Sequence, residues 1–175
     1  MERKKTLNVY KDAHTAWGSY DDFPVGQPGI DPMPHLSRNR CAQPFWLINE
    51  ADQVLIQMAG RGTLELVGAD PIALAPGDCA YIPARMPSRI VPDGENVQVR
   101  LKVEPPAREA VAWFCICGAR VRVIEIPAGI AQEHYWDAVQ AFNGDAKLRT
   151  CACGTVHPPA ELGDIAWLET AAALR

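Results

Sequence analysis

The sequence predicts an all-β fold: a single small antiparallel barrel with a cysteine-rich extension. Short apolar runs separated by Gly, Pro and Asp recur through the first hundred residues, a pattern typical of antiparallel strands. Two Cys pairs follow a Pro-Pro break at 105–106. We therefore expect three regions, which are an N-terminal arm at 1–43, a barrel core at 44–106, and barrel-closing strands, a helix and a cysteine extension at 107–175.

Length and charge exclude several classes of protein. The 175 residues suffice for one domain with a sizeable core. A formal charge of −4, with no basic run beyond Met1–Lys5, provides no field that would attract nucleic acid. No apolar run approaches the roughly 20 residues that a membrane helix needs. We expect a cytoplasmic protein without nucleic-acid or membrane partners.

The amino-terminal region contains few signals of regular structure. Residues 1–22 mix charges with an Ala-His-Thr-Ala-Trp stretch, which fits one or two helical turns. Residues 23–34 read FPVGQPGIDPMP, and this density of Pro and Gly disfavours both a helix and a central strand. We expect an extended arm that wraps on the barrel.

The barrel strands follow from the apolar runs and the turn residues between them. Turns are expected at 49–52, 68–71 and 92–96, where Asn, Asp, Gly and Pro cluster. The predicted strands cover 44–48, 53–58, 63–67, 79–82, 88–91 and 97–103.

The carboxyl-terminal third combines strands with a helix. Residues 113–127 predict two short strands around a Gly turn. A helix is expected over 130–142, because Ile130, Tyr135, Ala138 and Phe142 recur at helical spacing and Asn143-Gly144 follows. The tail at 160–175 predicts a short closing helix.

Four cysteines form two matched pairs. Cys115 and Cys117, like Cys151 and Cys153, are separated by one residue and followed by Gly. Four thiolates from two turns can complete a tetrahedral shell for one structural zinc or iron ion. Two vicinal thiol pairs or disulfides are the alternative reading. The remaining cysteines, Cys41 and Cys79, have no partner in sequence and are read as packing thiols.

The order of these motifs resembles a known family. The segments GRGTLEL and APGDCAYIP resemble the cupin superfamily, and WFCICG, RVRVIEIP and AKLRTCACGTVHPP resemble the tail of bacterial 3-hydroxyanthranilate 3,4-dioxygenase. The resemblance covers about Phe45 to Pro158. It implies a homodimeric cupin (jelly-roll) barrel with a rubredoxin-like cysteine site and a substrate of aromatic metabolism.

The resemblance fails at the catalytic metal. That family holds Fe(II) with a His, a Glu and a second His, at positions that read Leu47, Gln53 and Ser88 here. Asn49 stands at a further histidine position of cupins, and no His lies between His35 and His134. We expect no catalytic iron, and we read His134 and His157 as surface or interface residues.

A ligand site inside the barrel remains possible. Six residues are candidates for binding a small aromatic carboxylate: Trp46, Gln53, Arg85, Ser88, Arg89 and Arg100. Arg100 and Lys102 share a face of their strand, so both point inward or both point outward. Buried cations need a counter-charge, which a ligand, Glu65 or Glu104 can supply. Trp46 and Tyr81 either stack on a ring or belong to the core.

Three functions remain open from the sequence. The first is an enzyme with metal-independent chemistry of the lyase, isomerase or hydrolase type, acting on an aromatic or amino-acid-like carboxylate. The second is a non-catalytic binding or regulatory subunit. The third is a ring-cleaving dioxygenase with a relocated metal.

Overall fold

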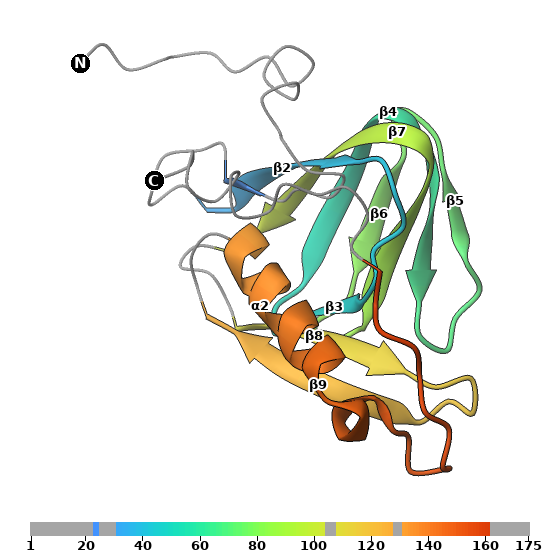
Figure 1. The fold of residues 1–175 in the computed structure, drawn as a ribbon. Coiled ribbons are helices and arrows are strands. Elements are labelled where there is room, and N and C mark those ends of the chain that lie inside the picture. Colours follow the sequence, from blue (N-terminus) through green and yellow to red (C-terminus); the bar gives the residue numbers. More distant parts are fainter. Residues whose placement is uncertain (1–22, 25–30, 104–107, 128–130, 162–175) are drawn as a thin grey trace.

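A computed structural model describes residues 23–24, 31–103, 108–127 and 131–161. Within these residues nine strands form one antiparallel sheet that closes into a barrel (Figure 1). The strands are β1 Phe23–Pro24, β2 Met33–Asn39, β3 Trp46–Asn49, β4 Gln53–Leu66, β5 Ile72–Leu74, β6 Cys79–Ile82, β7 Ser88–Lys102, β8 Glu109–Phe114 and β9 Arg120–Ile126. Helix α2, Ala131–Gly144, and the 3-10 helix η2, Ala146–Arg149, follow them.

The sheet is organised around β7. The strand order β1-β2-β7-β3-β8-β9 forms one path, and β4 pairs with β5, β6 and β7 outside it. The β4 and β7 strands pair antiparallel from Val54 opposite Leu101 to Leu66 opposite Ser88. This architecture confirms the predicted all-β barrel.

One predicted turn is wrong. Residues 92–96 lie within the continuous strand β7. Ala59 pairs with Val97 and Arg61 pairs with Asp93, so a two-residue step on β4 faces a four-residue step on β7. The extra residues form a bulge, which bends a strand without ending its pairing. Gly94, whose φ is 77°, lies inside this bulge and produced the turn signal.

Gly60 lies opposite the bulge and allows the two strands to approach closely. Its φ is 71°. A Cβ atom there would lie 2.3 Å from the Glu95 carbonyl oxygen and 2.9 Å from Asn96 Cα. Only glycine combines this conformation with this backbone contact.

The predicted boundary between the N-terminal arm and the barrel core, at residue 43, lies after β2, which is itself a strand of the barrel. Strand β2 pairs with β7 along its whole length, from Met33 opposite Lys102 to Asn39 opposite Asn96. The predicted helix at 130–142 is confirmed as α2. Of the strand pair predicted at 113–127, β9 lies within the predicted range, whereas β8 begins earlier, at Glu109. The helical turns expected within 1–22 and the tail helix at 160–175 fall mostly or wholly outside the described residues.

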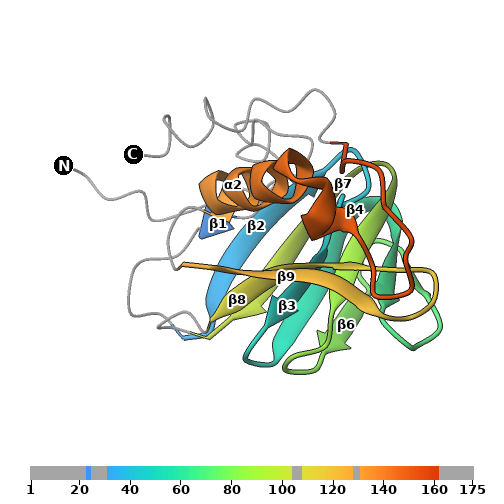
Figure 2. The same ribbon diagram turned by 60° about the horizontal axis from the view of Figure 1, so that its bottom comes forward.

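Two larger apolar clusters and a small one, formed by Leu36 and Val97, lie inside the described part of the fold. The first lies between β4, β5, β6 and β7 and contains Leu55, Leu64, Leu74, Ala80, Ile82 and Ile90. The second joins β3, β8 and β9 to α2, which lies across them (Figure 2). In this second cluster Trp113 stacks on Phe142 with ring centroids 4.0 Å apart, and Phe45 lies 5.1 Å from the buried ring of Tyr135.

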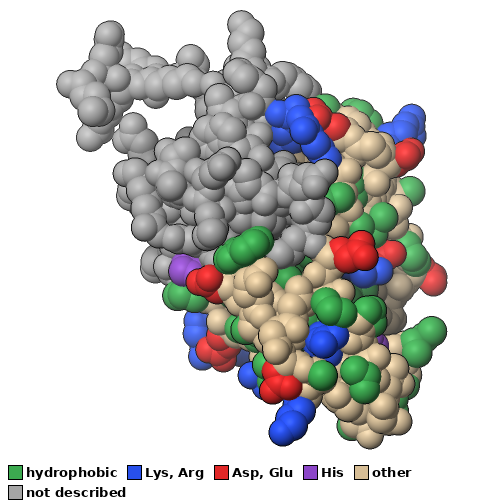
Figure 3. All heavy atoms as spheres, viewed as in Figure 1, with side chains coloured by type: hydrophobic (Ala, Val, Ile, Leu, Met, Phe, Trp, Pro, Cys, Tyr) green, Lys and Arg blue, Asp and Glu red, His purple; other side chains and the backbone are tan. Residues whose placement is uncertain are grey.

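The described surface carries mixed charges. Basic and acidic side chains are interspersed on the face seen in Figure 3. Arg38 and Arg40 both contact Glu95, and these guanidinium groups hold the pKa of that carboxyl below its ordinary value. Among the described residues no helix is long and apolar enough to cross a membrane.

Candidate functional site

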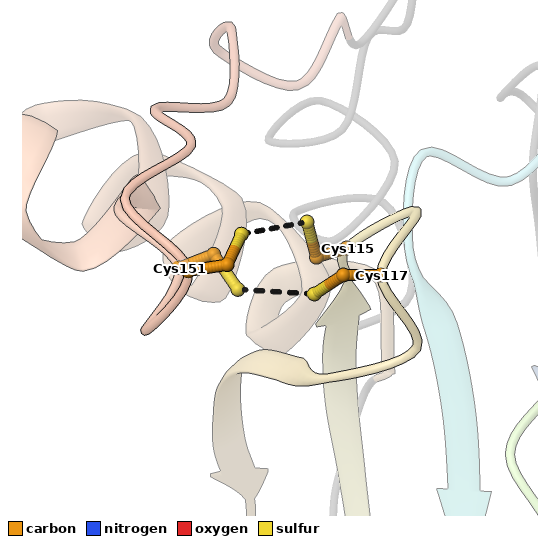
Figure 4. Close-up of side chains that lie close together, drawn as sticks. Cys115, Cys117 and Cys151 are labelled. Carbon is orange, nitrogen blue, oxygen red and sulfur yellow. Dashed lines mark hydrogen bonds between the residues drawn. The ribbon is translucent and has the colours of Figure 1, made fainter.

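The four predicted cysteines converge at one point of the structure. Cys115 and Cys117 lie in the turn between β8 and β9, and Cys151 and Cys153 lie in a turn after η2 (Figure 4). The sulfur atoms of Cys115 and Cys153 are 3.8 Å apart, and those of Cys117 and Cys151 are 3.7 Å apart. All four sulfurs lie within 4.8 Å of one another.

Both turns have the same backbone hydrogen bonds. The Gly118 N–H donates to the Cys115 carbonyl, and the Gly154 N–H donates to the Cys151 carbonyl, each at 2.9 Å. The Cys115 N–H donates to Ala119 and the Cys151 N–H donates to Thr155, each at 2.8 Å. The two glycines have φ values of 84° and 91°, a conformation that glycine adopts without a Cβ clash.

These sulfurs fit a tetrahedral metal ion. Zinc–sulfur bonds of about 2.3 Å place the sulfurs of a regular tetrahedron about 3.8 Å apart, which matches the separations of 3.8 Å between Cys115 and Cys153 and 3.7 Å between Cys117 and Cys151. Among the described residues this is the group of His, Cys, Asp or Glu side chains that can hold a metal. The arrangement therefore supports a metal site of four cysteines and leaves the identity of the metal open.

The environment of the four sulfurs is asymmetric. Cys115 and Cys151 are buried, whereas Cys117 and Cys153 are exposed. A hydrogen bond between the Cys153 sulfur and the Thr155 hydroxyl, helped by the Thr155 backbone, lowers the pKa of Cys153 to about 6. The Cys153 backbone acts to lower the pKa of Cys151, but burial and the neighbouring sulfurs raise it to about 12. One thiolate is thus favoured before any metal binds.

The three positions at which the resemblance predicts iron ligands are buried in the barrel. Leu47 is 5% exposed and packs in the second apolar cluster with Val111 and Tyr135. Ser88 is 2% exposed and lies opposite Leu47 in the β3–β7 pairing. Gln53 is 4% exposed, and its Oε1 accepts a hydrogen bond from Arg100 Nη1 at 3.4 Å.

The inner face of β7 carries two buried cations, Arg100 and Lys102. Both point inward, which resolves the alternative left open by the sequence. Lys102 Nζ lies 2.8 Å from Glu109, which also accepts a hydrogen bond from Asn49 Nδ2 at 2.6 Å. The expected counter-charge for Lys102 is thus found on β8. Glu65, another expected counter-charge, contacts Arg89 instead, and Glu104 lies outside the described residues.

A buried amide network continues along the inner faces of β2, β4 and β7. Gln98 Nε2 donates to Gln57 Oε1 at 2.7 Å, and Asn39 Nδ2 donates to Asn96 Oδ1 at 3.2 Å. Gln57 Nε2 donates in turn to the Ala59 carbonyl at 2.7 Å. The sequence interpretation missed this network. The sequence does contain a signal for it. Gln53, Leu55 and Gln57 are spaced two residues apart, so the two glutamines share one strand face with the apolar Leu55.

Comparison with known proteins finds similarity to dioxygenases. No family profile matches the chain. It is 26% identical over 116 residues to a 3-hydroxyanthranilate 3,4-dioxygenase of the yeast Meyerozyma guilliermondii, which covers 63% of this chain and 69% of that protein.

Solved structures of similar fold include two hydroquinone 1,2-dioxygenases. The enzyme from Sphingomonas sp. TTNP3, solved with 4-hydroxybenzoate bound, is 15% identical and covers 59% of this chain and 81% of its own, with a TM-score of 0.51. The enzyme PnpCD, solved with Cd²⁺ and 4-hydroxybenzonitrile, is 17% identical and covers 59% and 83%, with a TM-score of 0.50. The fold is a cupin barrel. The resemblance to 3-hydroxyanthranilate 3,4-dioxygenase is confirmed together with the cysteine cluster.

Three of the candidate binding residues lie away from the interior of the barrel. Arg89 alternates with the buried Ser88 and Ile90, contacts Glu65, and lies 4.6 Å from the ring centroid of Trp46. Trp46 alternates in the same way with the buried Phe45 and Leu47. Both therefore belong to the outer face of the sheet.

Arg85 is exposed and has a φ of 64°. It lines a surface pocket with Glu50, Arg108 and Glu125. The structure thus brings Gln53 and Arg100 into contact inside the cupin barrel, and places Ser88 on the buried face, while Trp46, Arg85 and Arg89 lie outside.

The remaining single residues stay apart from both sites. His134 lines a surface pocket beside Asp137 on α2. His157 is half-buried behind the second cysteine turn, where its carbonyl accepts a hydrogen bond from Arg149 at 3.0 Å. Cys79 is exposed on β6, so its interpretation as a packing thiol is wrong. Tyr81 is exposed on the same strand, which excludes the core alternative for this residue.

Proposed function

We propose that this cupin has lost the catalytic Fe(II) site of its dioxygenase relatives and binds a small aromatic or amino-acid-like carboxylate in its barrel. The chemistry it performs on this ligand is metal-independent, of the lyase, isomerase or hydrolase type. The observation that carries the proposal is the set Leu47, Gln53 and Ser88, which are buried at the three positions where the relatives place iron ligands.

The three side chains are poor substitutes for an iron-binding set. Leu47 has no donor atom and belongs to the buried cluster that contains Val111 and Tyr135. Gln53 and Ser88 offer only neutral oxygens, which compensate poorly for the hydration that Fe(II) loses on entering a protein. A ring-cleaving reaction of this kind requires a metal that binds the substrate through open positions. Without the metal, binding of the ligand can persist while oxygenation is lost.

The four-cysteine site has a different role in this proposal. A tetrahedral shell of four thiolates leaves no open position for a substrate, which is typical of structural metal sites. When bound, the metal would tie the β8–β9 turn to the segment after η2. Cys115, Cys117, Cys151 and Cys153 would hold it, and no reacting group would contact it.

An oxygen electrode tests the proposal. Purified protein supplied with Fe(II) and 3-hydroxyanthranilate is expected to consume no O₂ above the background of free iron, because the described residues inside the barrel include no His, Cys, Asp or Glu cluster that could hold the ion. The yeast dioxygenase assayed in parallel is the positive control. Turnover by this chain that requires added iron would mean that a ligand set exists elsewhere, and it would overturn the proposal in favour of a relocated metal.

A further inference from the structure

Strand β9 is an edge of the sheet. It pairs with β8 from Glu109 opposite Ile126 to Phe114 opposite Arg120, and among the described residues no strand pairs with its other side. Such an edge presents backbone N–H and C=O groups to which a further strand can bind, and native proteins usually cover or interrupt it. The edge of β9 is therefore a place to look for a partner.

A groove between this edge and α2 offers apolar contacts. Its volume is about 460 Å³. Four apolar side chains line it, which are Ile124 and Ile126 of β9 and Ala138 and Ala141 of α2. Glu125 and Asp137 also line the groove and are exposed, so they place two negative charges at its rim. The groove thus fits an extended segment that carries apolar side chains and positive charges.

The chain itself contains a segment of this kind, outside the described residues. Residues 6–10 read TLNVY, which alternates polar and apolar residues in the pattern of a strand with one apolar face. Three cations, Arg3, Lys4 and Lys5, precede it directly.

The rest of the amino-terminal region is long enough to bring this segment to the groove. Strand β1 lies near the amino-terminal end of α2 in both views of the ribbon (Figures 1 and 2). Residues 11–22, which precede β1, span up to about 40 Å when extended. Strand β9 has seven residues and is about 23 Å long, so this linker can reach either of its ends.

We propose that residues 6–10 add to the edge of β9 as an antiparallel strand and cover the groove beside α2. In this strand Leu7 and Val9 share one face, which meets the apolar walls of the groove. In this mode of recognition, backbone hydrogen bonds provide affinity and the pockets for alternate side chains provide specificity.

The charges of the two partners determine the direction of the added strand. An antiparallel strand places the cations at 3–5 at the end of β9 that carries Glu125 and adjoins Asp137. Arg120 and Arg122 are exposed at the other end of β9. A parallel strand would bring the cations at 3–5 close to these arginines, which is unfavourable.

Hydrogen exchange of the full-length protein tests this assignment. The amides of residues 6–10 are expected to exchange at least tenfold more slowly than in a synthetic peptide of residues 1–12, because strand pairing protects them. Leu7→Ser combined with Val9→Ser is expected to remove this protection and to lower that of β9, while protection of β4 shows that the fold is intact. Thr6→Ser combined with Asn8→Ser changes the opposite face of the strand and is the matched control, expected to be protected like the wild type.

An exchange of charges identifies the groove as the binding site. Asp137→Lys is expected to reduce the protection of residues 6–10 at least threefold at low ionic strength, because it repels the cations at 3–5. Lys5 shares a strand face with Leu7, so adding Lys5→Asp to this variant is expected to restore the protection. Asp70→Lys changes an exposed carboxylate before β5 and is expected to have no effect.

Three outcomes would overturn the inference. One is exchange of residues 6–10 as fast as in the free peptide. Another is undiminished protection in Leu7→Ser with Val9→Ser or in Asp137→Lys. The third is protection that falls on dilution of a protein with the mass of a dimer in light scattering, because the segment would then come from a second copy. None of these measurements involves O₂ consumption or iron, so the proposed function is tested separately.

Discussion

The Leu47 side chain contributes to packing rather than to metal binding. It stands where the resemblance predicts a histidine ligand, and it belongs to a buried cluster with Val111 and Tyr135. Burying a leucine contributes about 1.5–3 kcal/mol. A leucine at this position thus stabilises the contact between the sheet and α2 but cannot act as the metal ligand that the resemblance predicts. Restoring histidine at this position alone would lose the packing without completing an iron site, because Gln53 and Ser88 remain.

The cysteine centre gives a prediction at the level of one atom. Cys153→Ser removes a sulfur that lies 3.8 Å from Cys115 Sγ, so the mutant is expected to lose its bound metal. A structural metal contributes to folding free energy, and a loss of about 2 kcal/mol would lower the melting temperature by about 4–8 °C. Elemental analysis and a thermal melt measure both effects.

The control for this mutant is Cys79→Ser. Cys79 is exposed on β6 and lies outside the cluster, so this variant is expected to keep the full metal content and nearly the wild-type melting temperature. One metal ion per chain retained in Cys153→Ser would contradict the four-cysteine site. It would also indicate a second metal site and weaken the proposed function.

At the level of elements, the long β4–β7 pair depends on one close backbone contact. Gly60→Ala places a Cβ 2.3 Å from the Glu95 carbonyl at a φ of 71°. The positive φ costs about 1 kcal/mol and the overlap adds about 1–3 kcal/mol. We expect a loss of about 2–4 kcal/mol in the free energy of unfolding, measured by urea denaturation.

Gly68 serves as a control that separates the cost of a positive φ from the cost of steric overlap. Gly68 has a φ of 80°, but a Cβ there meets no atom within 4 Å. Gly68→Ala is therefore expected to cost only the conformational term of about 1 kcal/mol. Equal losses in the two variants would show that the strands separate easily at the bulge, contrary to the proposed role of Gly60.

The elements differ in how far the sequence alone determines them. Helix α2 and the strands around Gly118 follow from local periodicity and turn residues, and the cysteine quartet follows from two matched motifs. The bulge at 92–96 carries the same Pro, Asp and Gly as a true turn, and only its pairing with β4 distinguishes the two. The sequence alone also did not determine that Arg100 points inward. The alternation of residues along a strand shows which side chains share a face, but it does not show which face is buried.

At the scale of the whole molecule, the fold has two partly independent parts. The apolar cluster between β4 and β7 contains no residue from β8, β9 or α2. The other cluster joins those three elements to β3 and includes Trp113, two residues before Cys115. The metal site is thus coupled to the second cluster through the chain, while the first cluster is held by the long β4–β7 pairing. Removing the metal should affect these parts unequally.

Hydrogen exchange after chelation tests this division. When a chelator strips the metal, the four sulfurs lose the ion that joins the turn at 115–119 to the segment at 150–156. The backbone bonds of both turns, such as Cys115 to Ala119 and Cys151 to Thr155, should then open more often, because local opening follows local stability. We expect amide protection to fall in these two segments and to be retained in β4 and β7, and added zinc should restore it. Equal loss of protection in β4 would show that the metal stabilises the barrel as a whole, and the two-part description would then be wrong.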